Sequence, residues 1–165
     1  MKFTCIVSTL LAIVYAASVS EEFKLLAYRT SDPLRYGTVY SQDKILYFGP
    51  DQPPLVGNLT SCGYLQFAEG DYAVVTRDGY LQRGSKKDAA DGFSLKNGNL
   101  RYRDVNGFEA VHRDGKYLIS TQNHKGGFVF FVKAQKVQSK VDAHDFRLTG
   151  ACKLKTPSAT LYSTS

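Results

Sequence analysis

The stretch that decides the fold reads Tyr72-Ala73-Val74-Val75-Thr76-Arg77-Asp78-Gly79-Tyr80-Leu81. Two runs of aromatic, apolar and β-branched residues flank Asp78-Gly79. Asp-Gly between apolar runs is the strong local signal of a β-hairpin, because glycine adopts the positive φ that a tight primed turn requires. We therefore predict a hairpin whose strands lie on either side of this turn.

The same pattern recurs at a spacing of 36 residues on both sides of that hairpin. Aromatic residues lie at Tyr36, Tyr72 and Phe108, and valines at Val39, Val75 and Val111. The turns between the paired runs contain Asp43, Asp78 and Asp114. A fixed period is the signature of a repeated structural unit. We therefore predict three pseudo-repeats, with both the aromatic set and the valine set buried in equivalent places of the core.

The sequence predicts about twelve strands and no helix of any length. They cover residues 23–29, 34–40, 45–48, 55–59, 63–67, 72–75, 80–82, 93–96, 99–103, 108–111, 117–121 and 128–133. Twelve strands in three units favour an all-β, β-trefoil-like domain over residues 21–135. Another all-β sandwich or barrel is the alternative.

The first twenty residues have the features of a secretory signal peptide. Lys2 supplies a positive charge, an apolar run follows from residue 6, and small residues lie around positions 16–20. We expect cleavage between Ala16 and Ser20; the alternative is a buried N-terminal helix or strand. The sequence contains no second long apolar segment. We therefore expect an extracellular mature chain without a membrane anchor.

Cysteine use agrees with an oxidising compartment. Cys5 lies in the signal peptide, which leaves Cys62 and Cys152 as the two cysteines of the mature chain. We predict that they form a disulfide, which pins a C-terminal tail of residues 136–165 with a Ser/Thr-rich end; the alternative is two buried free thiols. Asn58-Leu59-Thr60 is an N-glycosylation sequon, so we predict a glycan on Asn58.

The charged and nucleophilic residues show no catalytic pattern. Basic residues outnumber acidic ones, 21 to 15, but they are scattered, whereas a nucleic-acid site is clustered. His112, His124 and His144 lack metal-ligand spacing, and no serine lies in a nucleophile elbow. We predict no catalytic residues, no cofactor, no metal and no nucleic-acid partner, and we expect a monomer that is not an enzyme.

Three stretches resemble the N-terminal domain of cell-wall mannoproteins of ascomycetous yeasts. They read GDYAVVTRDG at 70–79, DAADGFSLKNGNLRY at 88–102 and GFEAV at 107–111. The resemblance is to structural wall proteins of the GPI-anchored type, with a fainter likeness to the C-terminal domain of the PIR type. The long Ser/Thr-rich stalk, the GPI signal and the Asp-Gly-Gln linkage motif of those families are missing from the sequence.

The resemblance implies a structural protein of the fungal cell wall without catalytic activity. Its partners would be cell-wall polysaccharide or other wall mannoproteins. The alternative is a lectin-like carbohydrate-binding module, which exposed aromatic residues at equivalent positions of the copies would favour. A secreted inhibitor or toxin is a third class, supported only by the small size and basic charge.

Overall fold

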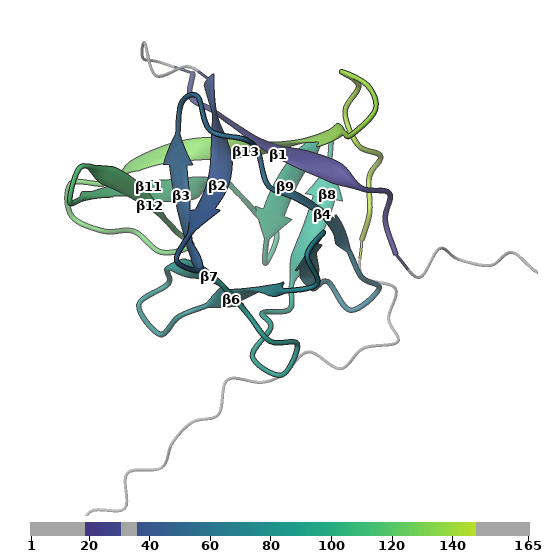
Figure 1. Ribbon diagram of the computed structural model, residues 1–165, viewed down its shortest axis with the longest axis horizontal. Helices are drawn as coiled ribbons and strands as arrows, with labels where there is room; N and C mark the ends of the chain where they lie inside the picture. Colours follow the sequence, from purple (N-terminus) through teal and green to yellow (C-terminus); the bar gives the residue numbers. More distant parts are fainter. Residues whose placement is uncertain (1–18, 31–35, 148–165) are drawn as a thin grey trace, which may run out of the picture.

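The domain is built entirely from short β-strands. The computed structural model describes residues 19–30 and 36–147, and within these ranges no segment is helical (Figure 1). Thirteen strands are present in the described residues. They are β1 (Phe23–Tyr28), β2 (Tyr36–Gln42), β3 (Ile45–Gly49), β4 (Val56–Leu59), β5 (Leu65–Phe67), β6 (Tyr72–Val75), β7 (Leu81–Gly84), β8 (Phe93–Lys96), β9 (Asn99–Tyr102), β10 (Val105–Asn106), β11 (Phe108–Arg113), β12 (Lys116–Ser120) and β13 (Phe128–Lys136).

The predicted all-β class is confirmed, and each predicted strand overlaps an observed one. The bounds of most strands differ from the predicted ones by one to three residues; β13, for example, continues to Lys136. The two-residue strand β10 was not predicted. β10 escapes a pattern search because it lasts for only two residues and both of them are exposed.

Tight turns lie where the sequence predicts them. Asp114-Gly115 joins β11 to β12, and both residues have positive φ, as a primed turn requires. Asp43 and Lys44 join β2 to β3 in the same way, with φ of 51° and 67°. The Asp78-Gly79 connection is longer: the Thr76 N–H donates to the Tyr80 carbonyl, and only Gly79 has positive φ.

The strand pairings close on themselves. Following hydrogen-bonded neighbours leads from β1 through β4, β5, β6, β7, β3, β12, β11 and β13 back to β1, a closed barrel of nine strands. The longest pairing joins β1 to β13, which run antiparallel over six residue pairs. Figure 1 shows these two strands side by side across the top of the domain.

Three hairpins recur in the order of the chain: β2–β3, β6–β7 and β11–β12. Their first strands begin at Tyr36, Tyr72 and Phe108, so the 36-residue spacing of the sequence coincides with the starts of these strands. The hairpins also contact one another, through Tyr117 opposite Phe48, Ile45 opposite Gln82, and Tyr80 opposite Ser120.

Phenylalanine side chains dominate the core. Phe23, Phe48, Phe67, Phe93 and Phe130 are almost completely buried. The rings of Phe48 and Phe130 stack with centroids 4.9 Å apart, although they lie 82 residues apart in the sequence. Burying an aromatic side chain contributes about 1.5–3 kcal/mol, so this cluster supplies a large share of the driving force for folding.

The aromatic set of the predicted repeat core is not uniformly buried. Phe108 is 3 % exposed and Val39 is 2 % exposed, and Val75 packs against the core. Tyr36, however, is 80 % exposed, so the prediction that it is buried is wrong. Tyr72 and Val111 are half-buried.

Strand geometry explains this error. Side chains alternate between the two faces of a strand, so residues three apart point to opposite faces. Tyr36 and Val39 therefore cannot both face the core from a strand that is buried on one side only. Phe108 escapes this limit because the start of β11 is covered on both faces, where Phe108, Glu109 and Ala110 are all buried.

The segment after β13 folds back onto the domain. The Ala143 N–H donates to the Ala134 carbonyl, and Phe146 forms a two-way backbone pair with Leu95. Cys152 and the Ser/Thr-rich end lie outside the described residues, as do residues 1–18 of the predicted signal peptide. The described residues contain no helix long and apolar enough to span a membrane.

Candidate ligand-binding groove

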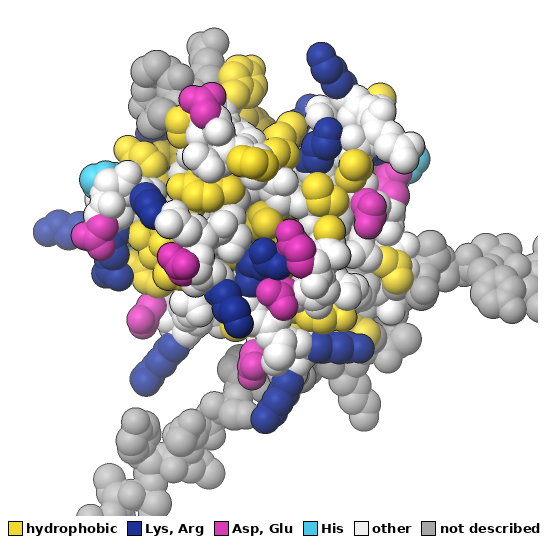
Figure 2. Space-filling view, viewed as in Figure 1, with side chains coloured by type: hydrophobic (Ala, Val, Ile, Leu, Met, Phe, Trp, Pro, Cys, Tyr) yellow, Lys and Arg dark blue, Asp and Glu magenta, His cyan; other side chains and the backbone are white. Residues whose placement is uncertain are grey.

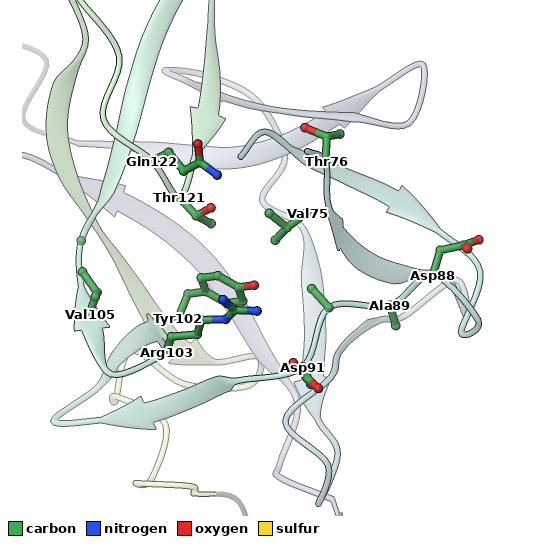
Figure 3. Close-up of a pocket in the computed structure, with 12 residues that line it drawn as sticks. Val75, Thr76, Asp88, Ala89, Asp91, Tyr102, Arg103, Val105, Thr121 and Gln122 are labelled. Carbon is green, nitrogen blue, oxygen red and sulfur yellow. The ribbon is translucent and has the colours of Figure 1, made fainter. Parts of the chain in front are cut away.

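Turns from four parts of the chain enclose a cleft of about 590 Å³. Figure 3 shows residues that line it: Val75 ends β6 and Thr76 follows it, Asp88 to Asp91 precede β8, Tyr102 ends β9 and Arg103 follows it, and Thr121 and Gln122 follow β12. The cleft thus lies where the second and third hairpin units meet.

The acidic side of the cleft is held by a short turn between β7 and β8. The Ser85 hydroxyl donates to an Asp88 carboxylate oxygen at 2.8 Å, and the Ala90 N–H donates to the Ala73 carbonyl of β6 at 2.9 Å. Asp91 is 8 % exposed and Ala89 is 5 % exposed. Two carboxylates are thereby fixed on one wall, one of them nearly buried.

Tyr102 and Arg103 form the opposite wall. The Arg103 guanidinium lies over the Tyr102 ring, 5.3 Å from its centroid, and Figure 3 shows the two side chains together in the cleft. The Arg103 N–H donates to the Gly92 carbonyl at 2.8 Å. A Cβ on Gly92 would lie 3.2 Å from the Arg103 Cγ, so the glycine leaves room for this side chain.

Burial raises the pKa of the Tyr102 phenol, and the negative charge of Asp91 adds to this effect against the opposing charge of Arg103. The phenol therefore remains protonated across the physiological pH range. It can donate a hydrogen bond to a ligand, while the stacked guanidinium supplies further donors in a fixed plane.

A second cleft of about 560 Å³ continues from the first. Tyr80 stacks on His124 with ring centroids 4.7 Å apart, and the Arg113 guanidinium lies 5.9 Å from the Tyr80 centroid. Thr76 and Gln122 line both clefts. The two clefts therefore form one groove, with an aromatic–arginine pair in each half and a hydroxyl and an amide where the halves join.

The pair Ser120 and His124 has the spacing of a nucleophile and a base. The Ser120 Oγ lies 2.8 Å from the His124 Nε2. Ser120 is completely buried, however, and its Oγ also accepts the Gln122 N–H at 3.1 Å. The Glu109 carboxylate accepts the backbone N–H of His124 and not its ring. The buried Ser120 hydroxyl therefore stabilises the loop after β12 through these two contacts and is not accessible to a substrate.

A separate cavity of about 610 Å³ lies between β1, β2 and β13 and the β8–β9 turn. Exposed Tyr36 lines it, and the Tyr28 hydroxyl donates to the Asn99 side-chain oxygen at 3.1 Å. Lys133 and Asp142 form an ion pair across it at 2.8 Å.

The site residues predicted from the sequence mostly lie away from the groove. Val75 lines it, whereas Asn58 lies in β4 on the face opposite buried Leu59. Cys62 lies half-buried in the turn after β4, and its predicted partner Cys152 is outside the described residues, so this pairing stays a prediction. The glycan on Asn58 is likewise untested by the geometry.

Sequence reasoning missed the groove, since its residues come from separate turns and share no motif.

The three histidines do not approach one another as ligands: the described residues contain no group of three His, Cys, Asp or Glu side chains suited to a metal ion. Basic and acidic side chains are interspersed on the face shown in Figure 2, without a single-sign patch.

Comparison with known proteins gives one informative match. The chain is 36 % identical over 124 residues to the cell wall protein CWP1 of Saccharomyces cerevisiae, which covers 74 % of this chain. It spans about half, 52 %, of the length of that relative. No protein-family model matches the chain. No solved structure matches it either.

Proposed function

Because this chain belongs to the family of yeast cell-wall mannoproteins, we propose that it is a structural constituent of the fungal cell wall and acts without catalysis. The observation that carries the proposal is the 36 % identity to a cell wall protein. The burial of Ser120 supports the non-catalytic part, because the nucleophile–base pair described above is closed to substrate.

The protein would work outside the cell, in contact with wall polysaccharide or with other wall mannoproteins, and as a monomer. An epitope-tagged chain in a yeast culture tests this: walls, medium and cell interior are separated, and the walls are extracted first with salt and detergent and then with glucanase. We expect the tag in the wall fractions. A protein confined to the cell interior would contradict the proposal.

A direct assay tests the absence of catalysis. The purified chain is incubated with wall glucan and with chitin, and released reducing ends are measured over time. We expect no release above that of a heat-denatured sample. Sustained release that scales with protein concentration would show that the protein is an enzyme.

We also infer that the domain is a β-trefoil. Strands β1, β4, β5, β9 and β13 pair in the order β5–β4–β1–β13–β9, and β8 pairs with β9. The Phe93 N–H at the start of β8 donates to the Gly63 carbonyl, next to β5, which brings the two ends of this series together. The three mutually contacting hairpins then form the cap. An experimental structure in which the units superpose by rotations of about one third of a turn is the expected result.

Residues at the end of the predicted signal peptide pair with the domain, and Val19 forms a β-bridge with Thr60. The Ser20 hydroxyl accepts the Leu59 N–H at 2.8 Å, and the Ser20 N–H donates to the Leu59 carbonyl at 2.7 Å. We therefore propose that signal-peptide cleavage precedes Ser20, which N-terminal sequencing of the secreted protein tests. Non-reducing peptide mapping tests the Cys62–Cys152 disulfide, and an endoglycosidase mobility shift tests the glycan on Asn58.

A further inference from the structure

We propose that the groove between Tyr102 and Tyr80 binds a linear, neutral polysaccharide chain. This inference rests on the proposed wall function, because a wall protein is surrounded by polysaccharide. The geometry of the groove gives the chemical class of the ligand and the residues that contact it.

The charges of the groove favour a neutral ligand. Three arginines line it, and three aspartates balance them: Arg77, Arg103 and Arg113 against Asp78, Asp88 and Asp91. The whole chain is basic, with a formal charge of +6, and attracts acidic polymers weakly over its surface. Within the groove, a phosphorylated or uronic-acid polymer would meet as many carboxylates as guanidiniums, so it gains no net attraction there.

The polar groups of the groove suit neighbouring hydroxyls. Each sugar hydroxyl both donates and accepts hydrogen bonds. The Gln122 amide does the same, and the aspartates accept while the arginines donate. Gln122 is exposed, at the junction of the two clefts, and Thr76 adds a hydroxyl there. A lipid or an apolar peptide would cover the exposed Gln122 amide without offering it a hydrogen-bond partner, at a cost of about 1–3 kcal/mol.

The aromatic rings are spaced along the groove. Tyr102 lies in the first cleft and Tyr80 in the second, and each is half-buried beside an arginine. Both rings are already packed, Tyr102 against Phe93 and Arg103 and Tyr80 against His124 and Arg113. The group that each tyrosine offers to a sugar is therefore its phenol hydroxyl, which both donates and accepts hydrogen bonds. The two phenols thus add one hydrogen-bonding group to each half of the groove.

The size of the groove indicates an extended ligand. Sites for small molecules are clefts of about 300–1,000 Å³, and each half of the groove lies within that range by itself. A disaccharide would occupy one half. An oligomer long enough to pass the Thr76–Gln122 junction would contact both halves.

Isothermal titration calorimetry on the full secreted chain tests the inference. The chain lacks tryptophan, so a fluorescence titration would be weak. The probes are hexamers and dimers of β-1,3-linked glucose, of β-1,4-linked N-acetylglucosamine and of α-linked mannose. A phosphorylated mannose oligomer is the acidic control. We expect at least one neutral hexamer to bind about tenfold or more tightly than its dimer, and than the phosphorylated oligomer.

Substitutions locate the binding. Gln122→Ala and Arg103→Ala change exposed side chains, so the fold is retained, as circular dichroism and a thermal melt check. Each should weaken binding of the hexamer by about tenfold. Tyr36→Ala is the matched control, because Tyr36 is exposed but lines the separate cavity.

The inference is overturned if no neutral hexamer binds at millimolar concentration, if the phosphorylated oligomer binds more tightly than every neutral hexamer, or if only Tyr36→Ala weakens binding. These outcomes are separate from the wall function. A protein found in the wall that binds no hexamer refutes the groove alone. A protein that binds a hexamer through Gln122 but is absent from the wall refutes the wall function alone.

Discussion

Tyr36 and Phe108 belong to the same set of aromatic residues spaced by 36, but their substitution by alanine should have very different effects on the free energy of unfolding. Phe108 is 3 % exposed, and its ring lies 6.3 Å from that of Phe130 in the core. Phe108→Ala removes buried surface and leaves a cavity, which costs about 3–5 kcal/mol. Tyr36 is 80 % exposed, so Tyr36→Ala should change the free energy of unfolding by less than about 0.5 kcal/mol.

Urea denaturation followed by circular dichroism measures both effects. For a small domain the slope is about 1–3 kcal/mol per M of urea. With a slope of about 2, the loss at Phe108 shifts the midpoint by about 2 M, and the change at Tyr36 shifts it by less than about 0.3 M. Tyr72 is half-buried and packs edge-on against Tyr64 at 6.3 Å, so Tyr72→Ala should give an intermediate shift.

Equal shifts at the three positions would refute this reasoning. They would mean that the aromatic residues occupy equivalent buried places, as the spacing in the sequence alone suggests. A larger shift for Tyr36→Ala than for Phe108→Ala would contradict the burial pattern of β2 and β11 directly. An unchanged slope in all variants is the control that the same transition is compared.

Three further substitutions test other features of the fold. Gly57→Ala would place a Cβ 2.5 Å from the Gln66 backbone oxygen on the paired strand, so we expect a loss of about 1–3 kcal/mol in urea denaturation; a loss below about 0.5 kcal/mol would contradict the close approach. Lys44 has a φ of 67°, so Lys44→Gly should stabilise the protein by about 0.5–1 kcal/mol relative to Lys44→Ala, and no difference would show that the turn is unstrained. The backbone N–H of His144 and the Lys136 ammonium lower the pKa of the Glu21 carboxyl from its ordinary value of 4.5. The ionised carboxylate therefore stabilises the folded protein above pH 4.5, and this stabilisation is lost as the pH falls through the pKa of the folded state. The thermal midpoint of Glu21→Gln should therefore lie below that of the parent at pH 6 and converge with it at acidic pH; parallel curves would contradict the role of this carboxylate.

Local sequence chemistry was enough to predict most of the architecture. The strands of this protein are short and bounded by turn residues. Asp114-Gly115 and Asn97-Gly98 adopt the positive φ values that are typical of such pairs in tight hairpin turns. Period-two runs of apolar residues then locate the strands between turns. The prediction was least accurate where a strand has no apolar residue facing the core, as in β10.

Burial could not be predicted with the same accuracy, because it depends on what covers each face of a strand. The spacing of Tyr36 and Phe108 is a property of the chain, whereas the cover over β11 comes from the tertiary structure. The groove was inaccessible to sequence reasoning for the same reason. Gln122, Asp91 and Arg103 lie in three different turns, and only the closure of the strands brings them together.

The three hairpins differ at the position that lies at the junction of the two clefts. At the phase of Thr76, the first unit has Tyr40, which stacks on Tyr47 with centroids 5.6 Å apart, and the third has His112, which packs on Tyr117 at 5.1 Å. Rings cover the surface at those two places, whereas the small side chain of Thr76 lies open at the junction of the two clefts. In the trefoil that we propose, the proposed ligand site thus arises where Thr76 differs from its counterparts Tyr40 and His112.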